Sequence, residues 1–295
     1  MITRRTFFKL MAASAAGMLS LGGYAGAIEP LLRLETTRYR LTPQGWPKGR
    51  TLRIVALADF HACEPWMPAA RIARICDHAN SLGGDVIVLL GDYMTGMRLV
   101  TGTVSPEHWS RALSGLKAPH GVHAVCGNHD WWHDPEAQRL RLPETIAHRA
   151  LRSVGITVHS NTAVRLGSDD EPFWIAGLED QLAYINEGKM DGRDDLPATL
   201  AQITDNAPAI LLAHEPDIFP NVPSRIALTL SGHTHGGQVN LFGWTPVVPS
   251  RYGSRYAYGH KIEDGRDLII SGGLGCSIAP IRFGSPPEIL VIDIG

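Results

Sequence analysis

The order of its apolar segments is what most constrains the fold of this 295-residue chain. Residues 51–58 and 85–90 are nearly continuous apolar runs, which are typical of strands buried on both faces of a sheet. Between them, apolar residues over 72–82 recur at helical spacing, and a Gly-Gly pair follows. A helix over 106–116 and a strand over 122–126 continue the alternation. This order predicts βαβ units, so we expect an α/β fold.

Beyond Gly155 the pattern changes to short apolar runs separated by turn residues, which predict a second set of strands. These runs are 156–159, 163–166, 173–176, 209–213, 227–230, 238–242, 267–271 and 288–294. Residues 181–207 are acidic and loop-like, with some helical character. Because no internal repeat or linker divides residues 51–295, we predict a single domain in which helices pack outside two sheets. Residues 28–50 are expected to form an N-terminal extension.

The N-terminus has the pattern of an export signal. Arg4 and Arg5 belong to a charged start, and the uncharged stretch over 10–28 is rich in Ala, Gly and Ser. Small residues predict cleavage after Ala27, so that residues 1–27 would be a signal peptide. The arginine pair, followed by two Phe and a Lys, resembles a twin-arginine signal. It implies export by the twin-arginine machinery to the bacterial cell envelope, either the periplasm or the outer face of the inner membrane. The alternative is an uncleaved membrane anchor.

Charge and cysteine content narrow the classes of function. The 27 Lys and Arg against 29 Asp and Glu give a net charge of −2, so we expect no nucleic-acid partner. Four cysteines are too few for a disulfide scaffold. We expect buried free thiols at Cys63, Cys76, Cys126 and Cys276, although an oxidising compartment would allow them to pair. The 13 histidines are numerous, and they favour metal or proton chemistry.

Residues that carry chemistry follow five of the predicted strands, at their carboxyl ends. Open α/β sheets form their sites at such ends, because the loops there converge. Each residue alone has an ordinary explanation, such as a turn or a satisfied hydrogen bond. Their joint position on glycine-rich or turn-prone strand ends predicts a shared polar site. The residues are Asp59, His61, Asp92, Asn128, His129, Asp130, His214, His233 and His235.

Oxygen ligands for metal come from the first three of these strand ends. Asp59 and His61 stand two apart at a strand end, so we expect them to point the same way and to share one ion. Asp92 offers two carboxylate oxygens and could bridge two ions. Asn128 adds a neutral amide oxygen.

Imidazole ligands come from the later strand ends. His233 and His235 would face apart on a regular strand, so the neighbouring glycines must form a turn that brings both to the site. His214 adds a further imidazole. Mixed oxygen and nitrogen ligands without thiolate suit Mn, Fe or Zn.

The motifs D-x-H, G-D, G-N-H-D, H and G-H-x-H, in this order, resemble the calcineurin-like metallophosphoesterases over nearly all of residues 51–294. The resemblance implies a single-domain, four-layer α/β/β/α sandwich that hydrolyses phosphoric esters with two divalent metal ions. The nucleophile would be a hydroxide that bridges the ions. A monomer is expected.

The resemblance also implies a role for each site residue. It assigns one ion to Asp59, His61 and His235, and the other to Asn128, His214 and His233, with Asp92 as the bridge. His129 matches the proton donor of the family, and Asp130 would orient its imidazole. Purple acid phosphatases need a tyrosine three positions after the bridging aspartate; Thr95 stands there, which argues against a tyrosinate-ligated ferric site.

Glycine-rich and proline-flanked motifs near the C-terminus indicate one branch of this family. Residues 236–238, 272–275 and 280–283 resemble the exported or membrane-tethered phosphodiesterase branch, some of whose relatives hydrolyse UDP-2,3-diacylglucosamine in lipid A synthesis. A phosphodiesterase or pyrophosphatase is therefore expected, with a lipid-linked substrate and membrane association as candidates. The alternatives are a broad phosphomonoesterase and a non-catalytic metal-binding scaffold of the same fold.

Two further sets of residues have open interpretations. Three residues follow Asp130 and either line a substrate pocket or pack against the next helix: Trp131, Trp132 and His133. Three arginines either hold a second phosphate or are ordinary surface residues: Arg251, Arg255 and Arg282.

Overall fold

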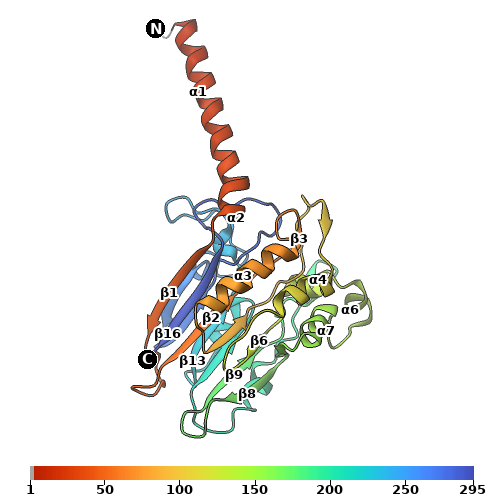
Figure 1. Ribbon diagram of the computed structural model, residues 1–295, viewed down its shortest axis with the longest axis vertical. Helices are drawn as coiled ribbons and strands as arrows, with labels where there is room; N and C mark the ends of the chain where they lie inside the picture. The colour runs from red at the N-terminus through yellow and green to blue at the C-terminus, as the bar shows by residue number, and fades with distance from the viewer. Residues whose placement is uncertain (1–2) are drawn as a thin grey trace.

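Two six-stranded β-sheets pack face to face in the computed structural model, which describes residues 3–295 (Figure 1). Across the first sheet the strands are β1 (Glu35–Leu41), β16 (Glu288–Ile294), β2 (Leu52–Leu57), β4 (Val86–Leu89), β6 (Val122–Ala124) and β7 (Thr157–Val158). Across the second they are β14 (Gly259–Glu263), β15 (Arg266–Ile270), β13 (Ile226–Ser231), β12 (Ala209–Leu212), β9 (Phe173–Gly177) and β8 (Thr162–Leu166).

Strand direction brings the site loops to one end of the molecule. Strands β2, β4, β6 and β7 run parallel in the first sheet, and β9, β12, β13 and β15 run parallel in the second. The two sheets meet at their carboxyl ends, where the N–H of His233 donates to the Asp59 carboxylate at 3.0 Å. The loops that follow β2 and β13 are therefore in direct contact.

Alternate residues of the strands build separate hydrophobic layers. In β2, Val55 and Leu57 face the helices, whereas Ile54 and Ala56 face the second sheet, as the two-residue period of a strand requires. The helices α3 (Ala69–Ser81), α4 (Pro106–Leu113) and α7 (Ile146–Ser153) cover the first sheet. The second is covered by α8 (Leu196–Leu200) and the 3-10 turns η2 (Pro216–Asn221) and η4 (Gly253–Tyr256). The predicted four-layer α/β/β/α sandwich is confirmed.

Helix α3 shows why the helical prediction succeeds. Its buried residues, Ile72, Ile75, Cys76 and Ala79, recur every three or four positions and face the first sheet. The helix ends before Gly83, whose φ of 66° favours glycine. All four cysteines are buried free thiols, as expected.

Several short elements connect the sheets. They are β3 (Cys63–Glu64) with β5 (Gly102–Thr103), the hairpin β10 (Tyr184–Asn186) with β11 (Lys189–Asp191), α5 (Asn128–Trp132), α6 (Pro135–Leu140) and η3 (His235–Gly237). The hairpin and α8 fill the segment that the sequence describes as loop-like with some helix.

The segment 238–242 was expected to be a strand, and the structure corrects this expectation. It makes only isolated bridges, between Val239 and Phe283 and between Leu241 and Trp244. Gln238 and Phe242, at the two ends of the segment, have positive φ angles of 58° and 56°, which are incompatible with an extended strand. This segment is instead an irregular loop.

A long N-terminal helix projects from the body (Figure 1). It consists of α1 (Arg4–Gly23), a π-helical turn η1 (Tyr24–Ile28) and α2 (Glu29–Leu32). The stretch Arg4–Leu32 is long and apolar enough to span a membrane, and only 6% of its most apolar window is buried. Strand β1 follows directly and pairs in parallel with β16. The predicted extension over 28–50 thus contributes an edge strand to the first sheet.

Candidate metal centre

Seven potential metal ligands converge where the two sheets meet. Asp59 and His61 follow β2, Asp92 follows β4, and Asn128 begins α5 after β6. The other three histidines follow strands of the second sheet, namely His214 after β12 and His233 and His235 after β13. All seven are buried. The predicted set is therefore brought together in space.

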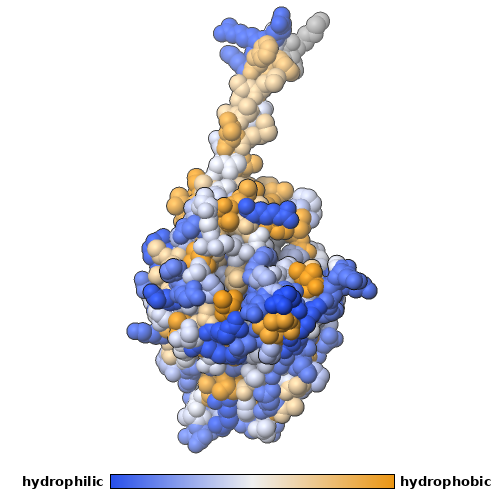
Figure 2. Space-filling view, turned by 90° about the vertical axis from the view of Figure 1, so that its right-hand side faces the viewer, coloured by the Kyte–Doolittle hydropathy of each residue, from blue (hydrophilic) through white to orange (hydrophobic). Residues whose placement is uncertain are grey.

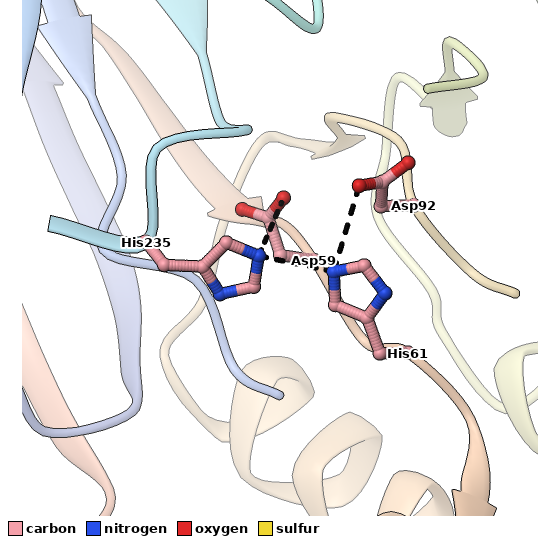
Figure 3. Close-up of side chains that lie close together, drawn as sticks. All are labelled: Asp59, His61, Asp92 and His235. Atoms are coloured by element: carbon pink, nitrogen blue, oxygen red, sulfur yellow. Dashed lines mark hydrogen bonds and ion pairs between the residues drawn. The ribbon is translucent and has the colours of Figure 1, made fainter. Parts of the chain in front are cut away.

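The ligand atoms form two groups that share one carboxylate. Within each group they lie within 4.8 Å of one another. The first group contains Asp59, His61, Asp92 and His235, and Figure 3 shows these side chains pointing toward one another. The second contains Asp92, His214 and His233. Asp92 is common to both groups.

Left-handed backbone conformations direct many of these side chains. Asp59, His61 and Asp92 have φ of 56°, 48° and 58°, and His233 and His235 have φ of 70° and 54°. Such conformations are strained for residues with a Cβ, and they concentrate at functional sites. Because β2 ends at Leu57, the strand period does not explain how Asp59 and His61 converge. The turn after the strand, rather than the strand period expected from the sequence, directs both side chains into the site.

Spacing in the first group fits a cation. The Nε2 atoms of His61 and His235 face each other at 3.0 Å, and His61 Nε2 lies 3.5 Å from Asp92 Oδ2 (Figure 3). Ligands about 2.1 Å from an ion and at right angles to each other would be separated by about 3 Å. Among the residues that the structure describes, Asp59 Oδ2 is buried and has no hydrogen-bond partner. An ion would satisfy both this oxygen and the facing nitrogens.

The second group has similar spacing. His214 Nε2 lies 3.2 Å from Asp92 Oδ2 and 3.2 Å from Asn128 Oδ1. His233 Nδ1 lies 2.9 Å from the same amide oxygen. Asp92 Oδ1 accepts the main-chain N–H of His129, so Oδ2 is the oxygen that faces both groups.

Main-chain carbonyls fix the tautomers of two histidines. His61 Nδ1 donates to the carbonyl of Met94 at 3.0 Å, and His214 Nδ1 donates to that of Leu90 at 2.6 Å. A carbonyl only accepts, so Nδ1 carries the proton in both rings. The Nε2 lone pair of each ring is thereby presented to the site, as in metal-binding histidines.

The electrostatics of the site also favour metal binding. Burial lowers the pKa of His61 to about 4, lowers that of His233, and holds that of His235 well below its ordinary value. These rings are therefore neutral and able to bind a cation. His214 differs: burial opposes its protonation, but Asp92 and other nearby acids outweigh burial and raise its pKa. A cation beside Asp92 would replace this proton as the neutralising charge.

Gly127 allows the loop after β6 to lie close to the side chains of Asp92 and His214. A Cβ built on Gly127 would lie 2.4 Å from Asp92 Oδ1 and 2.6 Å from His214 Nε2. Any side chain at this position would push the carboxylate and the imidazole away. The glycine of the G-N-H-D motif therefore has a packing reason.

The motifs of this site coincide with a known family. The sequence model described as "Calcineurin-like phosphoesterase" matches residues 52–237. The chain belongs to this family. The uncharacterized metallophosphoesterase YkuE of Bacillus subtilis (strain 168) is 30% identical over 99% of this chain and 98% of its own length. A transmembrane protein with metallophosphoesterase domain from Bos taurus is 27% identical over 95% of this chain and 60% of its own length. A dimetal phosphatase from Danio rerio has a TM-score of 0.42 at 13% identity, covering 76% of this chain and 88% of that one.

The protein is accordingly a metallophosphoesterase, a hydrolase that acts on phosphoric esters, and its two ligand groups form a candidate metal centre. His129 lies at the edge of this centre, with its ring perpendicular to that of His61 and 4.8 Å between centroids. Its Nε2 lies 3.5 Å from the Ser277 hydroxyl, and its Nδ1 lies 3.0 Å from Nε2 of His133. His133 was not assigned to this contact from the sequence, although its i, i+4 spacing from His129 in a short helix is a usable signal.

Asp130 has a different position from the one that the resemblance implies. Its carboxylate accepts the main-chain N–H groups of Gly127, Asp92, Tyr93 and Met94, at 2.9 to 3.0 Å. Four such bonds occupy both oxygens. Asp130 therefore holds the loop after β4 against the start of α5, and the neighbour of the His129 ring is His133. The expected contact between Asp130 and this imidazole is corrected.

A cavity of about 460 Å³ opens over the metallophosphoesterase centre. Asp92, His129 and His235 are among the residues at its base. Its walls are mainly apolar and include Val247, Pro249, Ile278, Ala279 and Ile281. The sequence did not identify these wall residues; the one available signal was the run of apolar residues in the loops after β13 and β15.

Of the two tryptophans after Asp130, one lines the cavity and the other packs against the helix start. Trp132 lines the cavity, and its Nε1 donates to the carbonyl of Leu182 at 2.7 Å. Trp131 is fully buried, and its Nε1 donates to Glu179 at 3.0 Å. Trp131 therefore packs the helix start, whereas Trp132 contributes to the pocket.

The three arginines have protein partners in the structure. Arg251 pairs with Asp217, and Arg255 pairs with Glu263. Arg282 is fully buried and donates to main-chain carbonyls, including that of Ser285 at 2.8 Å. None of the three is among the described residues that line the cavity.

Proposed function

We propose that this metallophosphoesterase hydrolyses phosphodiester or pyrophosphate bonds. One ion would be held by Asp59, His61 and His235, and the other by Asn128, His214 and His233, with Asp92 between them. The observation that carries the proposal is the pair of ligand groups that share Asp92 at the base of an open cavity. The donor set suits Mn, Fe or Zn.

The residues of the chain divide the chemical work. When bound, two divalent ions would polarise the phosphoryl group and activate a water molecule. His129 would donate a proton from Nε2, the ring nitrogen on the side of Ser277 and the cavity, to the leaving oxygen. Burial lowers the pKa of His129 to about 3, so the free ring is neutral at pH 7. A phosphoester in the cavity would add negative charge beside the ring and so favour its protonation.

The apolar cavity walls support a substrate with an apolar part. Val247, Ile278 and Ile281 are within the same cavity as the proton donor. A leaving group that carries acyl chains would bury apolar surface against them, which stabilises the complex. A lipid-linked substrate such as UDP-2,3-diacylglucosamine has this composition.

The N-terminal helix supports a location at the bacterial membrane. The Ala25 carbonyl accepts the N–H of Arg282 at 2.9 Å, and the Tyr24 ring meets that of Phe283 edge-on at 6.0 Å. Glu29 is buried and accepts the N–H of Ser285 at 2.8 Å. Cleavage after Ala27 would divide this set of contacts. We therefore favour a retained anchor after twin-arginine export over a cleaved signal, and the intact mass of the exported chain distinguishes the two.

The test is a substrate panel with the full chain. The protein is incubated with Mn, Zn or Fe(II) and with a chromogenic diester, a chromogenic monoester or a lipid-linked UDP-sugar. We expect the diester and the lipid-linked substrate to be turned over faster than the monoester. A faster monoester would indicate a broad phosphomonoesterase. No turnover from a metal-loaded protein would indicate a scaffold, which would have no need of a proton donor such as His129.

A further inference from the structure

Exposed apolar side chains lie on the cavity wall and in the loop segment between two wall residues, Val239 and Val247. They come from the two loops that follow β13 and β15, and their exposed fractions run from 37% to 104%. We call these residues the apolar rim: Leu241, Phe242, Trp244, Val247, Ile278 and Ile281. Large apolar side chains that gather on a surface favour an interaction site there. The last three also line the cavity, so the rim continues into the site.

Main-chain bonds hold the two rim loops together. Val239 and Phe283 form a parallel bridge, and the N–H of Asn240 donates to the carbonyl of Phe283 at 2.7 Å. Gln238 donates from its side chain to the carbonyls of Ala279 and Ile281 at 3.1 and 3.0 Å. The rim is therefore one structural unit.

This unit lies against the base of the N-terminal helix. The Phe283 ring contacts the Tyr24 ring, and the main-chain N–H of Arg282 donates to the carbonyl of Ala25. The rim loops are therefore in direct contact with the base of the helix. Figure 1 shows the helix leaving the body at the end where these blue loops lie, and Figure 2 shows apolar side chains around its base.

The length of helix α1 determines where along the chain the second surface of the bilayer would lie. Helix α1 has 20 residues, which at about 1.5 Å each span about 30 Å, the thickness of a bilayer hydrocarbon core. With Arg4 and Arg5 at one surface, the other surface falls close to Tyr24. Tyrosine and tryptophan are enriched at that level. The contacts of Tyr24 place the rim loops at the same height.

We propose that the apolar rim inserts into the interface of the bilayer that α1 spans, so that the cavity opens toward the lipid surface. Phe242 and Trp244 would sit among the headgroups and upper acyl chains, next to the helix. A substrate embedded in the membrane could then reach the metal centre without leaving the bilayer. The inference concerns the orientation of the site and holds for any phosphoester that the centre hydrolyses.

The experiment places a single fluorescent label on the rim of the full chain. The native thiols are buried, so Phe242→Cys can be labelled selectively with an environment-sensitive fluorophore. Phe242 is fully exposed, so its replacement removes no packing. The control is Ser168→Cys, an exposed position in the turn between β8 and β9, at the end of the body away from the helix. Thermal unfolding shows that each labelled protein is folded.

Both proteins are reconstituted into vesicles of phosphatidylethanolamine and phosphatidylglycerol, with and without nitroxide-labelled lipid. We expect the label at 242 to emit at shorter wavelength and to be quenched by the nitroxide lipid, while the label at 168 does neither. Identical, unquenched emission from both labels in vesicle-bound protein would overturn the proposal. A blue-shifted but unquenched label at 242 would also overturn it, because protein rather than lipid would then cover the rim. Trp244→Cys repeats the test at a second rim position.

Discussion

His129 lies beside the metal ligands but is not one of them. Its replacement should therefore affect proton donation without affecting metal binding. We predict that His129→Ala retains both metal ions but lowers turnover by about 10²- to 10⁴-fold, the usual contribution of a general acid. Metal analysis and turnover of a chromogenic diester check this together. Asp92→Ala is the matched comparison and should lose metal as well as activity. A fully active His129→Ala enzyme would remove the proposed role.

The contact between His133 and His129 leads to a second prediction. His133→Gln should lower kcat by about fivefold, because one hydrogen bond of about 1 kcal/mol no longer orients the ring. Metal content and KM should stay unchanged. The exposed His108→Gln is the control. If kcat of the His133 variant equals that of the wild type, this residue does not position the proton donor.

At the residue scale, the sequence identifies the residue types of the site but not their backbone. The predicted ligands meet because each follows a parallel strand, and parallel strands have their carboxyl ends at the same edge of a sheet. The left-handed conformations of Asp59 and His61 have no local signal, since neither residue is a glycine. Three of the four partners of Asp130 are equally hidden, because they come from a loop 36 to 38 residues earlier in the chain.

At the scale of elements, Asp130 joins the loop after β4 to the start of α5. We predict that Asp130→Asn lowers stability by about 1–3 kcal/mol, because its amide group would face main-chain donors in a buried position. Metal content should also fall, since the main chain at Asp92 would shift. Thermal unfolding and metal analysis measure both effects. The control is Asp170→Asn, at an exposed turn. Unchanged stability would show that these four bonds do not hold the loop.

Two of the four edge strands, β1 and β14, have no counterpart among the predicted strands. Strand β1 is mostly polar and is only partly buried, so it lacks the apolar run that predicts a central strand. Strand β16 was found because all but one of its residues are buried. The loop 238–242 has strand-like residues, and it is bent by turns whose geometry depends on contacts with Phe283. Burial helps to make a strand predictable but does not decide alone, because the apolar run over 163–166 predicts the partly exposed edge strand β8.

At the scale of the whole molecule, a buried histidine pair should make stability depend on pH. His123 Nδ1 lies 3.0 Å from His159 Nε2 at the edge of the first sheet, and burial lowers the pKa of His159 to about 3. The unfolded chain binds this proton at an ordinary pKa of about 6.5, so stability is full above that pH and is lost as the pH falls toward the folded value. The loss at about pH 5.5 is on the order of 1 kcal/mol.

Chemical denaturation at about pH 8 and about pH 5.5 measures this effect. We predict that His159→Gln reduces the difference in unfolding free energy between the two pH values, whereas His108→Gln leaves it unchanged. An identical pH dependence in wild type and His159→Gln would show that this ring does not control stability in acid.

The chain as a whole combines a projecting helix with a metal-binding body. The sequence shows that residues 1–27 are apolar and led by an arginine pair, but this composition fits both a signal and an anchor. The choice depends on tertiary contacts, such as those of Tyr24 and Glu29, that no local pattern encodes. The same contacts bring the rim loops to the base of the helix.

In the proposed function, hydrolysis depends on two ions held around Asp92. The most direct test is a titration: the full chain is stripped with a chelator, and turnover of a chromogenic phosphodiester is measured as a divalent ion is added back. We predict no turnover without metal and a plateau at about two ions per chain. Full turnover by the stripped protein, or a plateau at about one ion, would show that hydrolysis does not depend on two ions.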